Sequence, residues 1–540
     1  MNPVKVYSRY ISRAVLLTLV AFLPVLLSTA SFRNHAAAGL IAQDPLTEQQ
    51  RRGKQIYFQG TTSSGEDIVA SVGDSSLEVA GNVMACANCH GAYGHGKPEG
   101  AIRPSNLTWS SLSKATTTNR IHPPYTERSV GIAITQGKDP AGNKLRTAMP
   151  RFQLSAADLA DLIAYLKRLG YDRDPGVSDN KIVIGTILPK GSLAPMGQSI
   201  KATLAAYFTE LNSQGGIYNR TFELKFVEAS DSASATRAAV ERFIKDEQVF
   251  ALTAAFIPGA ENEIVTLMDQ LEVPLIGPLT LYPQTGEPLN RQVFYLLAGI
   301  TEQARVLVDF AAKQAGLKKI GIAVVYPRSK LNSAVVEAVT DQCKKNGLGA
   351  PQTYDYAVGS FDPAAAIKQV KRTEPSAVLL LGSGNESLSF MREADKLGWF
   401  PAIYGPAAAG GSGIFEAPAG FDGKIFFSFP TAPADQSAEG IKEFRALAEK
   451  YKLPAENVAS QLSTYGAAKV LVEGLKRAGK DLNRAQLVQS LEGLSGYQTG
   501  VTPAITYGPN RRIGALGAYV VTVDLKNKKY APASGWIVPN

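Results

Sequence analysis

The sequence predicts a multidomain protein in which a small all-α domain precedes a larger α/β part with two lobes. The chain has 540 residues, and one hydrophobic core stops growing at roughly 250 to 300 residues. Helical patterns flank the N-terminal motifs, whereas short β-branched strands alternate with helices beyond residue 180. A turn-rich polar segment at 171–180 separates the two patterns and predicts a linker.

Composition and charge exclude several classes of protein. Hydrophobic residues make up 45% of the chain and charged residues 19%, which is ordinary for a folded protein and excludes extensive disorder. The net charge of +9 comes from scattered basic residues and not from one cluster, so we expect no nucleic-acid partner.

Residues 1–38 have the layout of an export signal. A basic stretch through Arg13 precedes an uncharged run at 14–32, and small residues follow it. This predicts either a cleaved signal peptide, cut after Ala30 or Ala38, or an uncleaved inner-membrane anchor, because the run is nearly long enough to span a bilayer. Both alternatives predict a periplasmic protein whose membrane contact is limited to this segment.

The run Cys86–His90, with the sequence CANCH, is the most specific motif in the chain. Two thiols three positions apart can each add to one porphyrin, and the adjacent histidine then lies beneath the iron, which is typical of c-type haem attachment. A zinc or redox Cys-x-x-Cys would need a second ligand pair or a thioredoxin-like context, and neither is present. The remaining thiol, Cys343, is expected to be a small buried hydrophobe.

Two predicted helices flank this motif. The first spans 47–58 and places Gly53 and Tyr57 on one face, and the second follows an N-terminal cap at Ser155. The arrangement resembles class I cytochromes c, in which the first and last helices cross beside the haem, so a domain at 45–170 is expected. The segment before Cys86 is longer than is usual in that family, and its alternating pattern predicts a hairpin strand.

The resemblance to cytochromes c implies how one covalent haem c would be held. Cys86 and Cys89 would form the thioethers, and His90 would be the proximal iron ligand. Pro104 would supply the carbonyl that orients this histidine, and Met149, followed by proline, would be the distal ligand.

Two histidines, His95 and His122, are rival distal ligands, although each is more readily interpreted as a surface or loop residue. With both axial positions filled by the protein, the domain is expected to transfer single electrons and to perform no bond chemistry.

Strands and helices alternate from residue 181 onward, which predicts parallel sheets with right-handed crossovers in two Rossmann-like lobes. The expected strands lie at 181–186, 221–227, 249–254, 273–276, 319–325, 377–381 and 402–404.

This order, with the stretches 185–189, 212–217, 273–280 and 507–512, resembles the type I periplasmic binding proteins, in particular the branch of leucine/isoleucine/valine-binding receptors. The resemblance implies one binding-protein domain at 181–540, in which the chain crosses three times between lobes that close on a ligand. Lobe one would comprise 181–298 and 425–508, and lobe two 299–424 and 509–540.

The resemblance also implies a ligand cleft beyond the carboxyl ends of the strands. Free backbone N–H groups at helix starts there could hold an anionic ligand group. The expected cleft residues are Phe256, Ile257, Gly259 and Thr280 in lobe one, and Tyr326, Ser383, Asn385 and Tyr404 in lobe two.

One departure from the amino-acid receptors predicts a different ligand. Their Gly-Pro-Glu segment, whose acid pairs with the ligand ammonium, aligns with Gly405-Pro406-Ala407, and alanine cannot offset the cost of burying a cation. Lobe one likewise has Pro258 and Gly259 where a hydroxyl residue often assists carboxylate capture. We therefore expect a less polar or aromatic organic ligand and not an ordinary α-amino acid.

The sequence thus predicts an exported single-haem electron carrier fused to a hinged receptor for a small organic ligand. Its redox partner would be a periplasmic dehydrogenase or another cytochrome. The alternative is a solute-binding receptor for an ABC permease that carries an accessory haem domain. We find no set of catalytic acid, base or nucleophile in the sequence, so enzymatic activity is not expected.

Overall fold

The computed structural model describes residues 46–540, except for 74–76, 97–103, 118–119, 287 and 315–320. The predicted export signal at 1–38 lies outside the described residues. Among the residues described, no helix is both long and apolar enough to cross a membrane.

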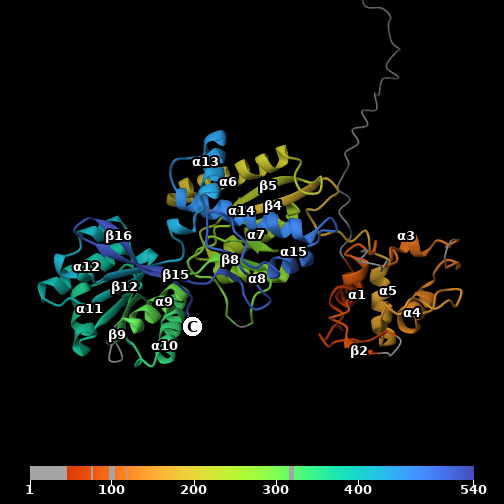
Figure 1. Cartoon of the computed structure of the whole chain (residues 1–540), viewed down its shortest axis with the longest axis horizontal. Coiled ribbons are helices and arrows are strands. Elements are labelled where there is room, and N and C mark those ends of the chain that lie inside the picture. Colours follow the sequence, from red (N-terminus) through yellow and green to blue (C-terminus); the bar gives the residue numbers. More distant parts are fainter. Residues whose placement is uncertain (1–45, 74–76, 97–103, 118–119, 287, 315–320) are drawn as a thin grey trace, which may run out of the picture. The chain divides into compact units, whose positions relative to one another are not determined.

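The N-terminal domain consists of helices and a small sheet (Figure 1). Its strands are antiparallel in the order β2-β1-β3, so the predicted hairpin is present, and β3 is an addition to the expected all-α domain. The helices are α1 (Glu48–Gln59), α2 (Cys86–His90), α3 (Trp109–Leu112), α4 (Glu127–Gln136) and α5 (Ala156–Leu166), and the strands are β1 (Val69–Val72), β2 (Leu77–Ala80) and β3 (Arg151–Phe152).

Helices α1 and α5 pack closely because Gly53 has no side chain. A Cβ atom added there would lie 2.0 Å from the carbonyl oxygen of Asp161 and 2.8 Å from Cβ of Tyr165. Beside this contact the Arg52 guanidinium lies 2.6 Å from the Asp161 carboxylate. The buried rings of Tyr57 and Tyr165 also pack together, with centroids 5.7 Å apart, as the sequence predicted for a close helix crossing.

We expect Gly53→Ala to destabilise the N-terminal domain by about 1 to 3 kcal/mol, because the added methyl group overpacks a contact made with backbone atoms. Thermal unfolding of the full chain, followed by circular dichroism, measures this loss. Gln49→Ala on the exposed face of the same helix is the control. Equal melting temperatures for the two variants would contradict the close crossing.

Lobe one contains a six-stranded parallel sheet in the order β14-β8-β7-β6-β4-β5. The strands are β4 (Lys181–Leu188), β5 (Thr221–Glu228), β6 (Ala251–Thr253), β7 (Leu275–Ile276), β8 (Val293–Leu297) and β14 (Ile513–Ala515). The helices are α6 (Ala194–Ser213), α7 (Ala233–Asp246), α8 (Glu261–Leu271), α13 (Ala438–Tyr451), α14 (Val458–Ala478) and α15 (Arg484–Glu492).

Lobe two contains a seven-stranded mixed sheet in the order β10-β9-β11-β12-β13-β15-β16, with β15 and β16 antiparallel to their neighbours. Cys343 is fully buried in its core, as predicted. The strands are β9 (Ile322–Pro327), β10 (Gln352–Tyr356), β11 (Ala377–Leu380), β12 (Ala402–Pro406), β13 (Ile425–Phe429), β15 (Ala518–Asp524) and β16 (Lys529–Ile537). The helices are α9 (Ile300–Lys313), α10 (Lys330–Lys345), α11 (Pro363–Val370) and α12 (Gly384–Lys396).

Strand pairing corrects the predicted lobe boundaries. Strand β13 pairs with β12 and β15 in lobe two, although residue 425 was expected to open a lobe-one segment. Strand β14 pairs with β8 in lobe one, although residues from 509 onward were expected in lobe two. The crossing after β8 lies where it was predicted, whereas these two later crossings are each displaced by one strand. Sheet membership depends on pairing between segments that are distant in sequence.

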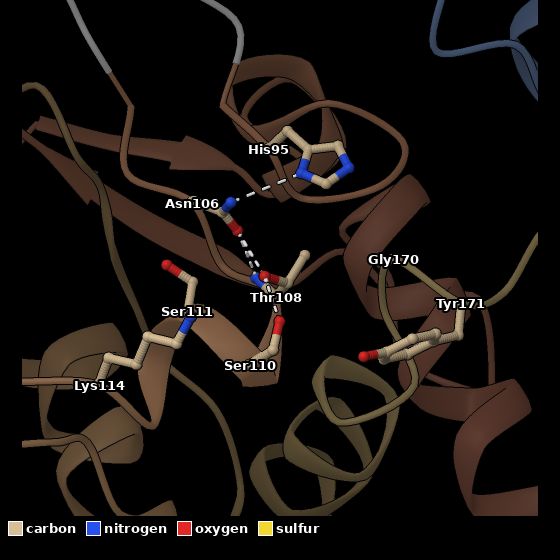
Figure 2. Close-up of a pocket in the computed structure, with 8 residues that line it drawn as sticks. All are labelled: His95, Asn106, Thr108, Ser110, Ser111, Lys114, Gly170 and Tyr171. Carbon is tan, nitrogen blue, oxygen red and sulfur yellow. Dashed lines mark hydrogen bonds between the residues drawn. The ribbon is translucent and has the colours of Figure 1, made fainter. Parts of the chain in front are cut away.

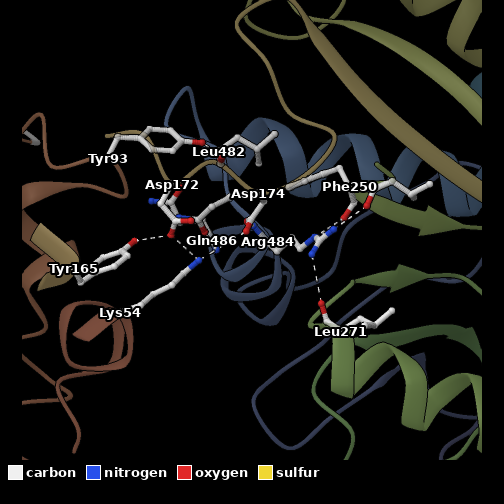
Figure 3. A network of polar contacts seen from close by, with 12 residues as sticks. Lys54, Tyr93, Tyr165, Asp172, Asp174, Phe250, Leu271, Leu482, Arg484 and Gln486 are labelled. Carbon is white, nitrogen blue, oxygen red and sulfur yellow. Dashed lines mark hydrogen bonds and ion pairs between the residues drawn. The ribbon is translucent and has the colours of Figure 1, made fainter. Parts of the chain in front are cut away.

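The segment at 171–180, predicted as a linker, is fixed by polar contacts on both sides (Figure 3). Asp172 accepts a hydrogen bond from the Tyr165 hydroxyl at 3.0 Å and lies 2.9 Å from the Lys54 ammonium. Asp174 accepts from the backbone N–H of Arg484, the first residue of α15, at 2.5 Å. The linker is therefore an ordered connection between α1, α5 and lobe one.

Arg484 strengthens the lobe-one side of this connection. Its guanidinium donates to the backbone carbonyls of Val249 and Phe250 at 2.8 and 2.9 Å. Tyr93, three residues after His90, also donates its hydroxyl proton to the carbonyl of Leu482. Sequence reasoning assigned no role to either residue.

Candidate haem site and ligand-binding loops

His90 ends the short helix α2 and is 9% exposed. Its Nδ1 lies 2.9 Å from the carbonyl oxygen of Ser105, which fixes the ring and leaves Nε2 for a metal. Burial lowers the pKa of His90, and the neutral ring is the form that binds iron. The orienting carbonyl thus belongs to Ser105 and not to Pro104, which corrects the predicted role of the proline by one residue.

One cavity of about 790 Å³ contains the predicted haem-binding residues. Both motif cysteines lie in its wall together with His90 and Met149. This size lies within the range of cofactor pockets, and the donor set fits a covalently bound haem. The apolar lining residues include Leu112, Val130, Ile134, Leu145, Phe152, Leu162 and Leu166.

Arg151 holds the Met149 segment and was missed in the sequence. Its guanidinium donates to the carbonyl of Met149 and, at 3.1 Å, to the carbonyl of Leu145. Gly137 gives it space, since a Cβ atom there would lie 1.8 Å from Nε of Arg151. The sequence feature that could have indicated this role is an arginine that directly follows a Met-Pro pair at the start of a strand.

The two rival histidines lie in different places. His95 is exposed and lines a separate polar cavity of about 330 Å³ with Asn106, Thr108 and Lys114 (Figure 2). His122 is 8% exposed and lines the haem cavity, with its Nδ1 2.7 Å from the carbonyl of Pro123. His95 is therefore a surface residue and His122 a loop residue between α3 and α4, as expected, but His122 is buried beside the predicted haem-binding residues.

The predicted ligand residues of lobe one lie at the carboxyl ends of neighbouring strands. Phe256, Ile257 and Gly259 belong to the loop between β6 and α8, and Thr280 follows β7. Glu261, which is 4% exposed, accepts from the Gly259 N–H and from the Thr280 hydroxyl, each at 2.9 Å.

In lobe two, Tyr326 lies near the end of β9 and is half-buried, while Ser383 and Asn385 are exposed at the start of α12. The backbone N–H and the hydroxyl of Ser383 both donate to Glu386, at 2.6 and 2.9 Å. Tyr404 is 4% exposed, and its ring stacks on Phe426 with centroids 5.2 Å apart.

Residues 181–529 match the family model described as periplasmic binding protein, and residues 79–170 match the cytochrome c model. The chain belongs to the periplasmic binding protein family. It combines this domain with a cytochrome c domain, which implies a haem cofactor. Family membership also implies a periplasmic or exported protein that binds a small ligand. The functions typical of binding-protein and cytochrome c domains are non-catalytic.

Curated relatives and solved structures agree with this assignment. Leu/Ile/Val-binding protein homolog 7 of Brucella abortus (strain 2308) is 23% identical over 344 residues, covering 61% of this chain and 84% of the relative. Homolog 8 of Brucella suis biovar 1 is 24% identical over 353 residues, covering 61% and 85%.

Two solved structures share the fold of the binding-protein domain. A branched-chain amino acid ABC transporter protein of Thermus thermophilus with bound valine has a TM-score of 0.55 at 18% identity, covering 67% of this chain and 97% of its own. A fatty acid ABC transporter substrate-binding protein of Thermomonospora curvata has a TM-score of 0.54 at 18% identity, covering 68% and 94%.

The predicted ligand residues of this periplasmic binding protein do not all lie at the strand ends. Phe256, Gly259, Thr280 and Ser383 do, whereas Tyr404 contributes to the lobe-two core. The expected free N–H donors are not free at Gly259 and Ser383, because internal carboxylates accept from both. Sequence reasoning missed these acids, although Ser383 and Glu386 have the spacing of a capping box.

Proposed function

We propose that this chain is an exported electron carrier with one covalently bound haem c, fused to a receptor for a small organic ligand. The observation that carries this proposal is the single cavity that contains both motif thiols, the oriented His90 and Met149. The haem would supply one-electron redox chemistry. Cys86 and Cys89 would attach it, and His90 and Met149 would fill its axial positions.

The residues around the cavity favour a six-coordinate iron. The Ser105 carbonyl holds the His90 ring, and Arg151 holds the backbone of Met149. A thioether opposite an imidazole raises the reduction potential. The protein would therefore accept electrons from a donor such as a periplasmic dehydrogenase, or exchange them with another cytochrome, and bind no oxygen. Its N-terminal segment would be cleaved or would anchor it to the inner membrane.

Contacts between the two domains support a link between ligand binding and the haem. Asp172 and Asp174 connect Lys54 of α1 to Arg484 of α15, and Tyr93 connects the haem-binding loop to Leu482 (Figure 3). A change in lobe one would therefore reach residues near His90 through packed, hydrogen-bonded groups.

Purified full-length protein is expected to contain one covalent haem per chain, to show reversible one-electron reduction and to bind no carbon monoxide in its reduced form. Haem stoichiometry, potentiometric titration and absorbance under carbon monoxide measure these properties. Immediate carbon monoxide binding would contradict the proposed filled coordination, and a haem-free chain would contradict the carrier function.

We expect Asp174→Ala to loosen the connection between the domains, because the α15 N-terminus loses its acceptor and the half-buried Arg484 loses a nearby negative charge. A lost charge-assisted hydrogen bond costs about 1 to 2 kcal/mol, or roughly 5- to 30-fold in local opening. Limited trypsin digestion at Arg173 should become faster by about this factor. Asp246→Ala, an exposed acid at the end of α7, is the control, and unchanged cleavage would contradict an ordered connection.

A second candidate function is a solute receptor for an ABC permease with an accessory haem domain. The similarity to binding proteins of ABC transporters favours it. Ligand binding that leaves the haem potential unchanged, together with copurification of a permease, would support this alternative over a ligand-regulated electron carrier.

A further inference from the structure

The strand orders locate the expected ligand-binding edge in each lobe. In lobe one the chain order reverses at β4, which lies between β5 and β6, and in lobe two it reverses at β9, between β10 and β11. Ligands of open α/β sheets bind outside the carboxyl ends of the strands at such switch points. The loop after β6 leads into α8, and the loop after β11 leads into α12.

An internal carboxylate occupies the loop donors of lobe one. Glu261 is 4% exposed, and one of its oxygens accepts from the Gly259 N–H while the other accepts from the Thr280 hydroxyl. The Thr280 oxygen in turn accepts from the N–H of Tyr282 at 3.0 Å. The Gly259 N–H and the Thr280 hydroxyl therefore already donate to a carboxylate of the protein.

Lobe two repeats this arrangement at its own switch point. Glu386 accepts both the N–H and the hydroxyl of Ser383. It also lies against Gly382, where a Cβ atom would be 2.6 Å from a Glu386 oxygen and 2.6 Å from the Tyr356 hydroxyl. Burial, followed by the nearby Glu386 carboxylate, raises the pKa of Tyr356, so its ring stays uncharged.

Two basic residues of the neighbouring loops are paired with acids. Lys190, after β4, lies 2.8 Å from Asp231, and Arg328, after β9, pairs with Asp355. Their charges are thus partly neutralised at the positions where a cation would otherwise attract an anionic ligand.

We propose that Glu261 and Glu386 make this site selective against anions, so that its ligand is an uncharged organic molecule that donates hydrogen bonds. A ligand carboxylate would meet like charges in place of free donors, whereas a carboxylate can accept further hydrogen bonds at its remaining lone pairs. This inference rests on the proposed receptor function and names the class of its ligand. The half-buried Phe256 and Tyr326 fit an apolar or aromatic body.

The test uses pairs of probes that have nearly the same shape and differ in charge: phenylacetamide with phenylacetate, benzamide with benzoate, and 4-methylpentanamide with 4-methylpentanoate. Binding to the full-length haem protein is measured by calorimetry. At least one amide should bind, about tenfold or more tightly than its paired acid. In Glu261→Gln or Glu386→Gln this preference should fall severalfold, because glutamine keeps an acceptor oxygen without the charge.

Glu263→Gln is the matched control, since Glu263 lies in the same first turn of α8 and should leave the preference unchanged. Tighter binding of any acid than of its amide would overturn the inference and leave the receptor function intact. An amide preference unaltered in both glutamine variants would show that the two acids only cap their helices, which also overturns it. Failure of every probe to bind would contradict both the ligand class and a receptor for such molecules.

Discussion

Replacing both Cys86 and Cys89 with alanine is expected to abolish covalent haem attachment. The two thiols share one cavity with His90, and the porphyrin would have no other cysteine within reach, because Cys343 is buried in the core of lobe two. A denaturing gel stained for haem measures the result directly, since only a covalent bond keeps haem on an unfolded chain. The expected loss is complete.

Cys343→Ala is the matched control for this experiment. It removes a thiol from a fully buried site in the other domain, so it should leave haem stain at the level of the unmodified chain while causing a modest loss of stability. Haem that remains bound after denaturation of the Cys86 and Cys89 double variant would contradict the assignment of these thiols.

The second large effect is expected for Met149→Ala, which would remove the distal ligand. The vacated axial position should then bind carbon monoxide, and the reduction potential should fall by on the order of 100 mV, because axial-ligand identity sets the potential over a wide range. Potentiometric titration and carbon monoxide difference spectra measure the two changes. The covalent haem should remain, since its attachment depends on other residues.

Two further variants make this prediction specific. Met84→Ala alters a second methionine that lines the same cavity but adjoins the attachment helix, and it should leave the iron six-coordinate. His122→Ala tests the buried rival. If the carbon monoxide site opened in His122→Ala and stayed closed in Met149→Ala, the distal ligand would be the histidine.

Local sequence patterns predicted most helices and several strands correctly. Thr47 and Ser155 cap α1 and α5 as their spacing indicates, because a cap depends on residues three positions apart. Strands with continuous apolar runs, such as β4 and β11, were also found. The short strand β3, with two residues, has no periodic pattern to detect, and it forms only because the β1 strand offers an edge.

The functional sites were predictable to different degrees. The proposed haem-attaching thiols and His90 can be read from five consecutive residues. The carbonyl that contacts the His90 ring depends on how the chain returns past it, and it was predicted at Pro104 whereas the structure places it at Ser105. Of the expected ligand residues, Phe256, Gly259, Thr280 and Ser383 lie at strand ends, whereas Tyr404 lies within β12 and contributes to the lobe-two core. The sequence could not show that the Glu261 carboxylate accepts hydrogen bonds from Gly259 and Thr280, because Thr280 lies after strand β7.

The sequence by itself determined the cytochrome c motif, the alternating α/β pattern and the division into two domains. These depend on spacing within a few residues or on periodicity within one element, and both can be read locally. Only the tertiary structure decided which sheet takes β13 and β14, how the segment at 171–180 is held, and which acids occupy the ligand-loop donors. Each of these depends on hydrogen bonds or strand pairs between segments that are distant in sequence. The local sequence allows several partners equally well, and only the packed structure selects one of them.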